Sequence, residues 1–182
     1  MKRSFWSSEK ILSMSALFIS LLTLIVFIYQ TDLIRKQQYK SVYPHLGFIN
    51  RFGGTLNYQY VLNNVGIGPA IIDEVRVQYG EKNYEDIINF VDDQIEESDS
   101  ITYFHTNLAR GRLIPAGEHI SLIKLASEQD LEGTGLPLNN NKGSFQLYEV
   151  LNSDSLIIEV KYSSIYGESW IIRNGSKSPE MQ

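Results

Sequence analysis

The sequence predicts a mainly β protein: a single N-terminal transmembrane helix followed by an antiparallel β-sandwich or small β-barrel of about seven strands, with one or two short helices. Two observations support this fold class. An uninterrupted apolar run near the N-terminus has the length of a membrane span. Beyond it, short segments of alternating apolar and polar residues recur between turns rich in Gly, Pro and Asn. Alternating strand and helix units, which would indicate a parallel sheet, do not appear.

The apolar run from Ile11 to Tyr29 is the first element, and it contains no charged residue, Gly or Pro. As a helix it would be about 28 Å long, close to the hydrocarbon thickness of a bilayer. The run ends in bulky residues and offers no small-x-small cleavage site, which favours a retained span over a cleaved signal peptide. We therefore predict a transmembrane helix over residues 11–30, preceded by a basic tail at 1–10.

Aromatic and basic residues flank this span, as is typical of a membrane interface. We assign the interface role to Trp6, Tyr29, Arg35, Lys36 and Lys40. Good helix formers continue beyond the span and predict a juxtamembrane helix over 31–43, which ends before a proline at position 44. The basic residues on the two sides are equal in number, and we expect the C-terminal domain to be cytoplasmic.

Small residues form a stripe on one face of the span. They are spaced three, four and three positions apart, so they share a helix face: Ser13, Ala16, Ser20 and Thr23. Small residues let transmembrane backbones approach closely, and hydroxyl groups can bond across the contact. The stripe predicts a homo-oligomer formed through the anchor. The alternative is a chance alignment of residues that are common in membrane helices.

Residues 44–174 change to a β pattern, in which apolar residues alternate with polar ones. Each alternating segment ends at a turn signal such as Gly-Gly or Pro-Ala-Gly. Seven segments fit strands, at 46–49, 56–62, 70–79, 101–105, 119–125, 156–163 and 170–172.

Two segments of this domain have helical patterns instead. Apolar residues recur every four positions in 83–98, which predicts an amphipathic helix with an acidic, solvated outer face. Residues 145–151 fit a short helix, and 127–143 read as a loop. We expect the polar tail at 175–182 to be frayed.

A loop between the second and third strands combines Gly66, Gly68 and Pro69 within the sequence NNVGIGPA. We predict a shaped structural loop, in which the glycines can adopt positive φ and the proline fixes the direction of exit. A phosphate-binding loop is the less favoured interpretation, because no Lys-Ser/Thr pair and no helix follow.

Four segments in this order resemble a known group: YKSVYPHL, NNVGIGPAII, RLIPAGE and YSSIYGESW. They resemble uncharacterised bacterial membrane proteins with one N-terminal anchor helix and an Ig-like β-sandwich that carries an NxGxGPA loop. The resemblance spans about residues 11–170. It implies an Ig-like sandwich and a location in the bacterial inner (plasma) membrane, and it implies no activity and no catalytic residue.

Charge and composition restrict the function further. The first 40 residues carry six basic and two acidic side chains, whereas the remainder carries ten basic and nineteen acidic ones. A basic flank suits anionic lipid headgroups, and an acidic domain argues against binding a nucleic-acid polymer. The chain has no cysteine, and His45, His105 and His119 lack metal-ligand spacing. We therefore expect no catalytic site, no metal site and no cofactor.

The favoured hypothesis is a single-pass, membrane-anchored, non-catalytic β-domain that binds or interacts at the membrane surface. Its expected partners are the lipid bilayer, further copies of the chain, and a protein or small ligand. The alternative is an oligomerising transmembrane effector of a bacterial, antiphage-type signalling system, whose β-domain senses a small ligand such as a nucleotide. That alternative rests on an analogy of layout. Nothing in the sequence favours a third hypothesis, a hydrolase.

Overall fold

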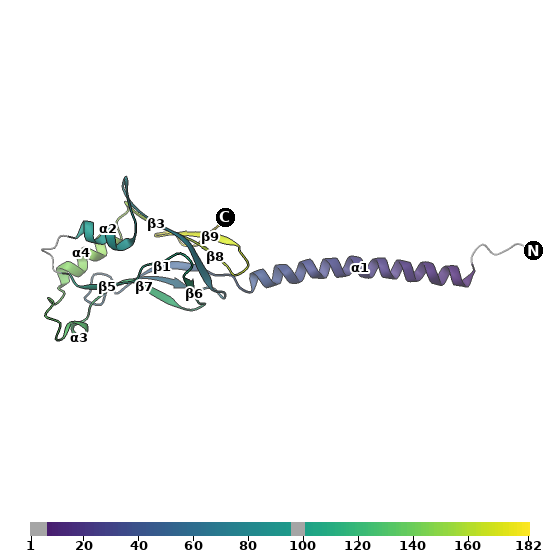
Figure 1. Cartoon of the computed structure of the whole chain (residues 1–182), viewed down its shortest axis with the longest axis horizontal. Helices are drawn as coiled ribbons and strands as arrows, with labels where there is room; N and C mark the ends of the chain where they lie inside the picture. The colour runs from purple at the N-terminus through teal and green to yellow at the C-terminus, as the bar shows by residue number, and fades with distance from the viewer. Residues whose placement is uncertain (1–6, 96–100) are drawn as a thin grey trace, which may run out of the picture. The chain divides into compact units, whose positions relative to one another are not determined.

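A computed structural model describes residues 7–95 and 101–182, and the chain divides into two compact units, Met1–Ser41 and Val42–Gln182 (Figure 1). The first unit contains helix α1, Ser8–Lys40. None of its side chains is buried, and its mean hydropathy reaches 2.6 over 18 residues. Among the described residues it is the one helix long and apolar enough to cross a membrane. The span predicted over 11–30 and its predicted continuation over 31–43 thus form one continuous helix, which ends at Lys40, three residues before the predicted end.

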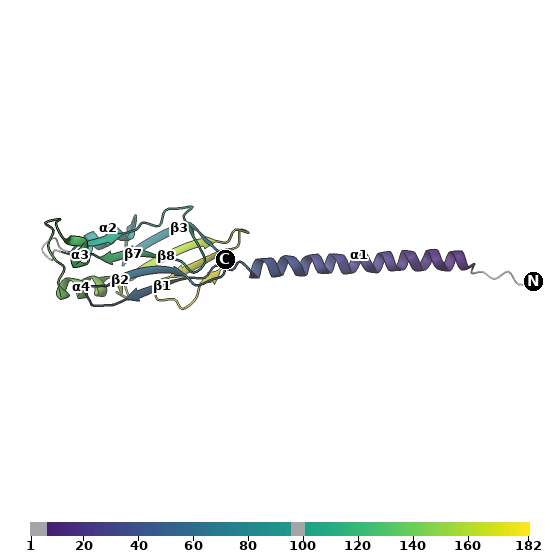
Figure 2. The ribbon, with the colours of Figure 1, turned by 90° about the horizontal axis from the view of Figure 1, so that it is seen from below.

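The second unit is built from two antiparallel sheets, which bears out the mainly β prediction (Figure 2). Sheet A has the strand order β1-β2-β7-β5, with bounds Leu46–Arg51, Gln59–Asn64, His119–Leu125 and Tyr103–His105. Sheet B has the order β10-β9-β8-β3-β4, with bounds Glu180–Met181, Ser169–Arg173, Leu156–Ser163, Ala70–Tyr79 and Lys82–Tyr84. A further strand, β6 (Leu113–Ile114), pairs with β3.

The described residues thus form ten strands, three more than the seven predicted segments. The three additional strands have only two or three residues each, too few to show an alternating pattern: β4, β6 and β10. The last of them overturns the expectation of a frayed tail, because Glu180 and Met181 pair with Ile171 and Trp170 of β9.

Both sheets contribute to one apolar core. Strand β8 illustrates why the sequence folds this way: Leu156, Ile158, Val160 and Tyr162 are buried, and the residues between them are more exposed. A strand with this period of two has one face for the core and one for solvent. A slip of one residue in register would turn all four side chains towards water, so the pattern also fixes the pairing.

Three helices lie at one end of the sheets (Figure 1). Helix α2, Ile87–Gln94, begins where the Asp86 carboxylate accepts a hydrogen bond from the Asn89 amide at 2.8 Å. The predicted helix over 83–98 therefore started too early, because Lys82–Tyr84 forms β4 and pairs with β3. Its predicted end, from residue 96, lies outside the described residues.

The other two helices also differ from prediction. Helix α3, Glu128–Leu131, lies in the segment predicted as a loop, and a capping box between Ser127 and Asp130 supports its start. Helix α4, Asn141–Leu151, begins four residues before the predicted Phe145. The Asn140 side chain caps this helix by accepting a hydrogen bond from the Gly143 amide at 2.8 Å, and this cap favours the earlier start.

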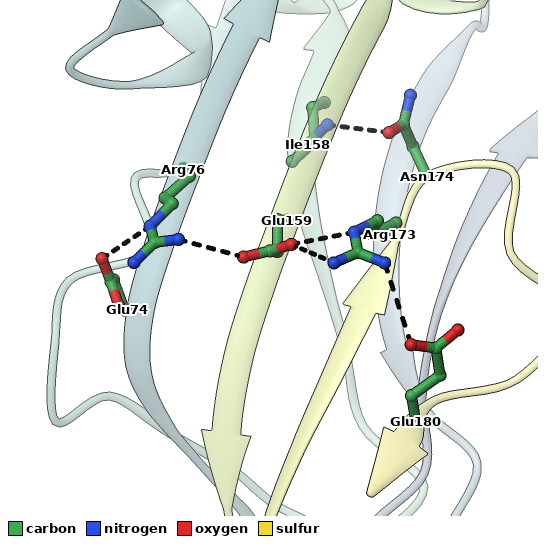
Figure 3. A network of polar contacts seen from close by, with 7 residues as sticks. All are labelled: Glu74, Arg76, Ile158, Glu159, Arg173, Asn174 and Glu180. Atoms are coloured by element: carbon green, nitrogen blue, oxygen red, sulfur yellow. Dashed lines mark hydrogen bonds and ion pairs between the residues drawn. The ribbon is translucent and has the colours of Figure 1, made fainter. Parts of the chain in front are cut away.

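An ion-pair ladder crosses the strands of sheet B (Figure 3). Arg76 on β3 contacts Glu74 at 2.8 Å and Glu159 on β8 at 3.5 Å. Glu159 also pairs with Arg173 on β9 at 2.7 Å, and Arg173 lies 3.8 Å from Glu180 on β10. Opposite charges in register support the pairing of neighbouring strands. The ladder thus links the short C-terminal strand to the rest of the sheet.

Candidate functional site

The glycine-containing loop after β2 packs on the first residues of the β-domain. The Val65 amide donates to the His45 carbonyl oxygen at 2.9 Å, and the Ile67 amide donates to the Tyr43 carbonyl oxygen at 3.0 Å. The Gly68 amide also donates to the Tyr43 oxygen, at 3.3 Å. The loop therefore pairs with the segment Val42–His45 much as a strand would. This segment directly follows α1 in the sequence.

Positions 66 and 68 require glycine because no side chain would fit there, and not because of their backbone conformation. A Cβ atom at Gly68 would lie 1.8 Å from the Val42 carbonyl oxygen, and one at Gly66 would lie 2.4 Å from the His45 nitrogen. Neither glycine has a positive φ, so the loop does not use the left-handed conformation that glycine allows. Both positions allow two backbone segments to touch, which any larger residue would prevent.

Asn64, at the end of β2, joins three segments and is only 1% exposed. Its Oδ1 atom accepts hydrogen bonds from the His45 amide at 3.1 Å and the Gly66 amide at 3.0 Å. Its Nδ2 atom donates to the carbonyl oxygens of Gly68 at 2.8 Å and Ile114 at 3.1 Å. A buried amide that satisfies both its donors and its acceptors fixes the surrounding backbone in one arrangement.

We call the segments that meet at Asn64 the entry cluster, defined as Val42–His45, Asn64–Pro69 and Ile114–Gly117. Residues 114–117 are part of the entry cluster because the Gly117 amide donates to the Asn64 carbonyl oxygen at 2.9 Å. Pro69 lies directly before β3, so its place agrees with a residue that directs the chain out of the loop.

Aromatic side chains continue this cluster into the core. The Tyr43 ring meets the Trp170 ring edge to face at 5.3 Å, and Trp170 stacks on Tyr162 at 5.9 Å. The Tyr162 hydroxyl accepts a hydrogen bond from the Leu46 amide at 3.3 Å. Burial raises the pKa of Tyr162 above its usual value, so the hydroxyl stays neutral at physiological pH.

The loops around the entry cluster expose apolar side chains. Val65 and Ile67 are 64% and 67% exposed on the glycine-containing loop, and Ile165 is 51% exposed on the turn between β8 and β9. Leu113 of β6 is also half exposed. Backbone contacts hold these loops, and their side chains remain available for contact with other molecules.

The small residues predicted to mediate self-association lie within α1. The Ser13 hydroxyl donates to the Glu9 carbonyl oxygen at 2.9 Å, and the Thr23 hydroxyl donates to the Ile19 carbonyl oxygen at 2.8 Å. Both hydroxyl protons are therefore used inside the helix. A contact along Ser13, Ala16, Ser20 and Thr23 would depend mainly on their small size.

The predicted interface residues are also on this helix, except Trp6, which lies outside the described residues. Tyr29 is exposed, Arg35 and Lys40 follow it on the same helix, and Lys36 pairs with Asp32 at 2.8 Å. An ion pair four residues apart on an exposed helix adds little stability, so these charges remain suited to contact with polar groups outside the chain.

The acidic face of α2 is engaged in contacts within the domain. Asp93 accepts hydrogen bonds from Lys82 at 2.8 Å and from the Tyr84 hydroxyl at 2.6 Å, and Asp92 accepts one from the Tyr103 hydroxyl. The Lys82 contact, foremost, lowers the pKa of Asp93 below its usual value. Among the residues that the structure describes, no three His, Asp or Glu side chains group as metal ligands.

Four segments that the sequence analysis singled out meet around the entry cluster: YKSVYPHL, NNVGIGPAII, RLIPAGE and YSSIYGESW. Residues 42–45 and 64–69 belong to the first two of these segments, 114–117 to the third, and Tyr162 and Trp170 to the fourth. Sequence spacing missed the role of Asn64, although an Asn directly before a Gly-containing loop is a turn signal. No protein-family model matches the chain, and neither a curated protein nor a solved structure matches it.

Proposed function

We propose that the chain is a single-pass membrane protein whose β-domain is a non-catalytic module for binding at the membrane surface. The observation that carries this proposal is the contrast between the two units. Helix α1 is apolar and has no buried side chain, whereas the following unit has a complete core of its own. A helix that its own chain leaves uncovered needs an apolar environment from elsewhere, and a bilayer supplies it.

Membrane extraction tests the anchor. The full chain should stay in the membrane fraction after alkaline carbonate treatment, and its intact mass should include residues 1–40. Replacing Leu21 and Ile25 with Arg should release it, because each Arg at the centre of a span costs about 2.5–3.5 kcal/mol. The matched control is Leu33→Arg with Ile34→Arg, beyond the predicted span, which should leave the chain in the membrane. Loss of residues 1–40 from the mature chain would contradict the proposal.

The anchor is also proposed to associate with itself through its small-residue stripe. Ala16→Leu with Ser20→Leu should reduce cross-linked dimers, because larger side chains separate the backbones. Leu21→Phe with Ile25→Phe enlarges residues on the opposite face and serves as the control. Unchanged cross-linking in the first variant would contradict self-association through this face.

We also propose that the domain belongs to the Ig-like sandwich group and that it faces the cytoplasm in a bacterial inner membrane. The support for the first point is the pair of antiparallel sheets around one core, together with the meeting of the four resembling segments at the entry cluster. The orientation rests on expectation, and a reporter fused after Gln182 tests it. Periplasmic activity of that reporter would overturn it.

The alternative, an effector that senses a nucleotide, is less well supported. A cavity of about 260 Å³ lies between the sheets, and two carboxylates, Glu85 and Asp86, line it. Acidic side chains at a cavity repel phosphate groups. The binding-module function therefore fits the charge of this cavity better than a nucleotide sensor does.

A further inference from the structure

The cavity between the sheets has an apolar interior. Its lining includes Val77 and Ile158 of sheet B and Leu122 of sheet A, all of which belong to the buried core. At about 260 Å³ it is just below the usual range for small-molecule pockets, which begins near 300 Å³. The cavity therefore suits a single apolar side chain or a fragment of similar size.

Strand β3 runs beside this cavity with part of one edge open. Strand β8 pairs with β3 along its first edge. On the second edge, β6 pairs with Ala70 and Ile71, the Arg112 carbonyl oxygen accepts from the Ile72 amide, and β4 pairs with Val77–Tyr79. Between them, residues 73–76 have no strand partner on that edge within the described part of the chain. Backbone groups that point from such an edge can pair with another chain.

Charged side chains of both signs line the same edge. A cleft of about 520 Å³ adjoins the cavity and shares Val75, Glu85 and Leu108 with it. Arg110 and Lys161 also line this cleft, as do two carboxylates that have partners within the domain: Asp73 accepts a hydrogen bond from Ser163, and Glu74 pairs with Arg76. Glu85, Arg110 and Lys161 form no ion pair with any residue that the structure describes.

These unpaired charges contrast with the ladder on the same sheet, where Arg76, Glu159 and Arg173 have partners (Figure 3). Charges of both signs at one cleft suit a ligand that also carries both signs. A nucleotide carries only negative charge, whereas a peptide segment carries either sign along its length.

We propose that the open edge of β3 binds an extended peptide segment of a protein partner. The segment adds a short strand beside residues 73–76, and one apolar side chain enters the 260 Å³ cavity. A basic residue of the segment pairs with Glu85, and an acidic residue pairs with Arg110 and Lys161. Main-chain pairing gives such complexes their affinity, and pockets for alternate side chains give them specificity. This inference rests on the proposed binding function and adds the class of partner.

Binding of a designed peptide to the full chain in detergent micelles tests the inference. The probe is the labelled peptide Lys-Val-Leu-Val-Glu with blocked ends, measured by fluorescence anisotropy. We expect saturable binding that falls about tenfold or more when both Val amides of the probe are methylated, because methylation removes main-chain donors. Val75→Phe, which narrows the cavity, should have a similar effect. Absence of saturable binding, or equal binding of the methylated probe, would overturn the proposal.

Reversing the charge at Glu85 provides a second test of the inference, and it leaves the apolar core unchanged. Glu85→Lys should weaken binding of the probe about tenfold, and a probe with Glu in place of its Lys should recover it. Glu81→Lys, at an exposed position in the adjacent hairpin turn, is the matched control. It should change the affinity for neither the original probe nor the probe with Glu in place of Lys. Adenosine monophosphate is the competing ligand, and its binding in place of the peptide would also overturn the proposal. Membrane extraction of the full chain does not depend on β3. A failure of the membrane-anchor proposal can therefore be distinguished from a failure of the peptide-binding proposal.

Discussion

The two ends of the β-domain are both closed by short loops that contain glycine, yet they are held in different ways. At the entry cluster, Gly66 and Gly68 bring one backbone against another. At the other end, which we call the far end, the turn Phe52–Asn57 packs against side chains of α4. A Cβ atom at Gly53 would lie 2.5 Å from the Tyr148 ring, and the Ser144 hydroxyl donates to the Thr55 carbonyl oxygen.

This difference decides how each end should respond to change. A side chain can turn to make room, whereas a paired backbone can move only if its hydrogen bonds break. The far end even keeps a strained residue: Phe52 has a φ of 55° and is 62% exposed. The entry cluster is therefore expected to be intolerant of substitution, and the far end tolerant.

The largest expected effect is at Gly68. Gly68→Ala places a Cβ atom 1.8 Å from the Val42 carbonyl oxygen, so the loop must separate from residues 42–45. Overpacking costs about 1–3 kcal/mol and occasionally more, and we expect at least the upper value here. Urea unfolding of the full chain in micelles, followed by Trp fluorescence, measures the loss.

The matched control at the far end is Gly53→Ala. We expect a smaller loss, of about 1 kcal/mol, because the Tyr148 ring is a side chain that can shift. Equal losses in the two variants would mean that the two ends do not differ in the way described.

The next effect is the loss of the Asn64 side chain. Asn64→Ala leaves the partly buried amides of His45 and Gly66 without their acceptor, and an unsatisfied group costs about 1–3 kcal/mol when it is fully buried and less when water can reach it. We expect a total loss of about 2–4 kcal/mol by the same unfolding measurement. Asn50→Ala removes an amide near the far end that is more exposed, and it should cost less. A larger loss from Asn50→Ala would reverse the comparison.

A change of opposite sign is expected at Phe52. Phe52→Gly should stabilise the domain by up to about 1 kcal/mol, because glycine adopts a positive φ without the steric cost that Phe incurs. The exposed ring contributes little packing to offset this gain. Thermal unfolding of the full chain measures the shift. A lower unfolding temperature would show that the ring makes stabilising contacts within the chain.

The smallest effect concerns the exposed Lys82–Asp93 pair. Its contacts lower the pKa of Asp93 from 3.8, so the stabilisation is present above that pH and is lost as the pH falls through the lowered pKa. Asp93→Asn should therefore be slightly less stable than the native chain at pH 7, and the difference should shrink as the pH falls through the lowered pKa. A difference that stays the same as the pH is lowered would contradict the assignment to charge.

Local sequence signals predicted the features that depend on local pattern. The apolar run near the N-terminus predicted α1, and the alternation of apolar and polar residues in Leu156–Ser163 predicted β8. The short strands β6 and β10 were not predicted, because each has only two residues and is defined by the strand with which it pairs. The helix predicted over 83–98 began too early, because Lys82–Tyr84 follows a hairpin turn and pairs with β3 as a strand.

The candidate sites were harder to predict for a related reason. The glycines of NNVGIGPA suggested a shaped loop, but their steric role depends on Val42–His45, about twenty residues earlier in the chain. The open edge of β3 likewise depends on where β4 and β6 end on that strand. Long-range contacts of this kind leave no periodic signal in a sequence.

Hydrogen exchange of single amides in the full chain tests the central comparison most directly. The amides of Val65 and Ile67 donate to carbonyl oxygens of residues 42–45, and those of Thr55 and Tyr58 donate to carbonyl oxygens of the far-end turn. We predict that the first pair exchanges only with global unfolding of the domain, and that the second pair exchanges much faster through local opening. Equal protection of both pairs, or faster exchange of Val65 and Ile67, would contradict the account.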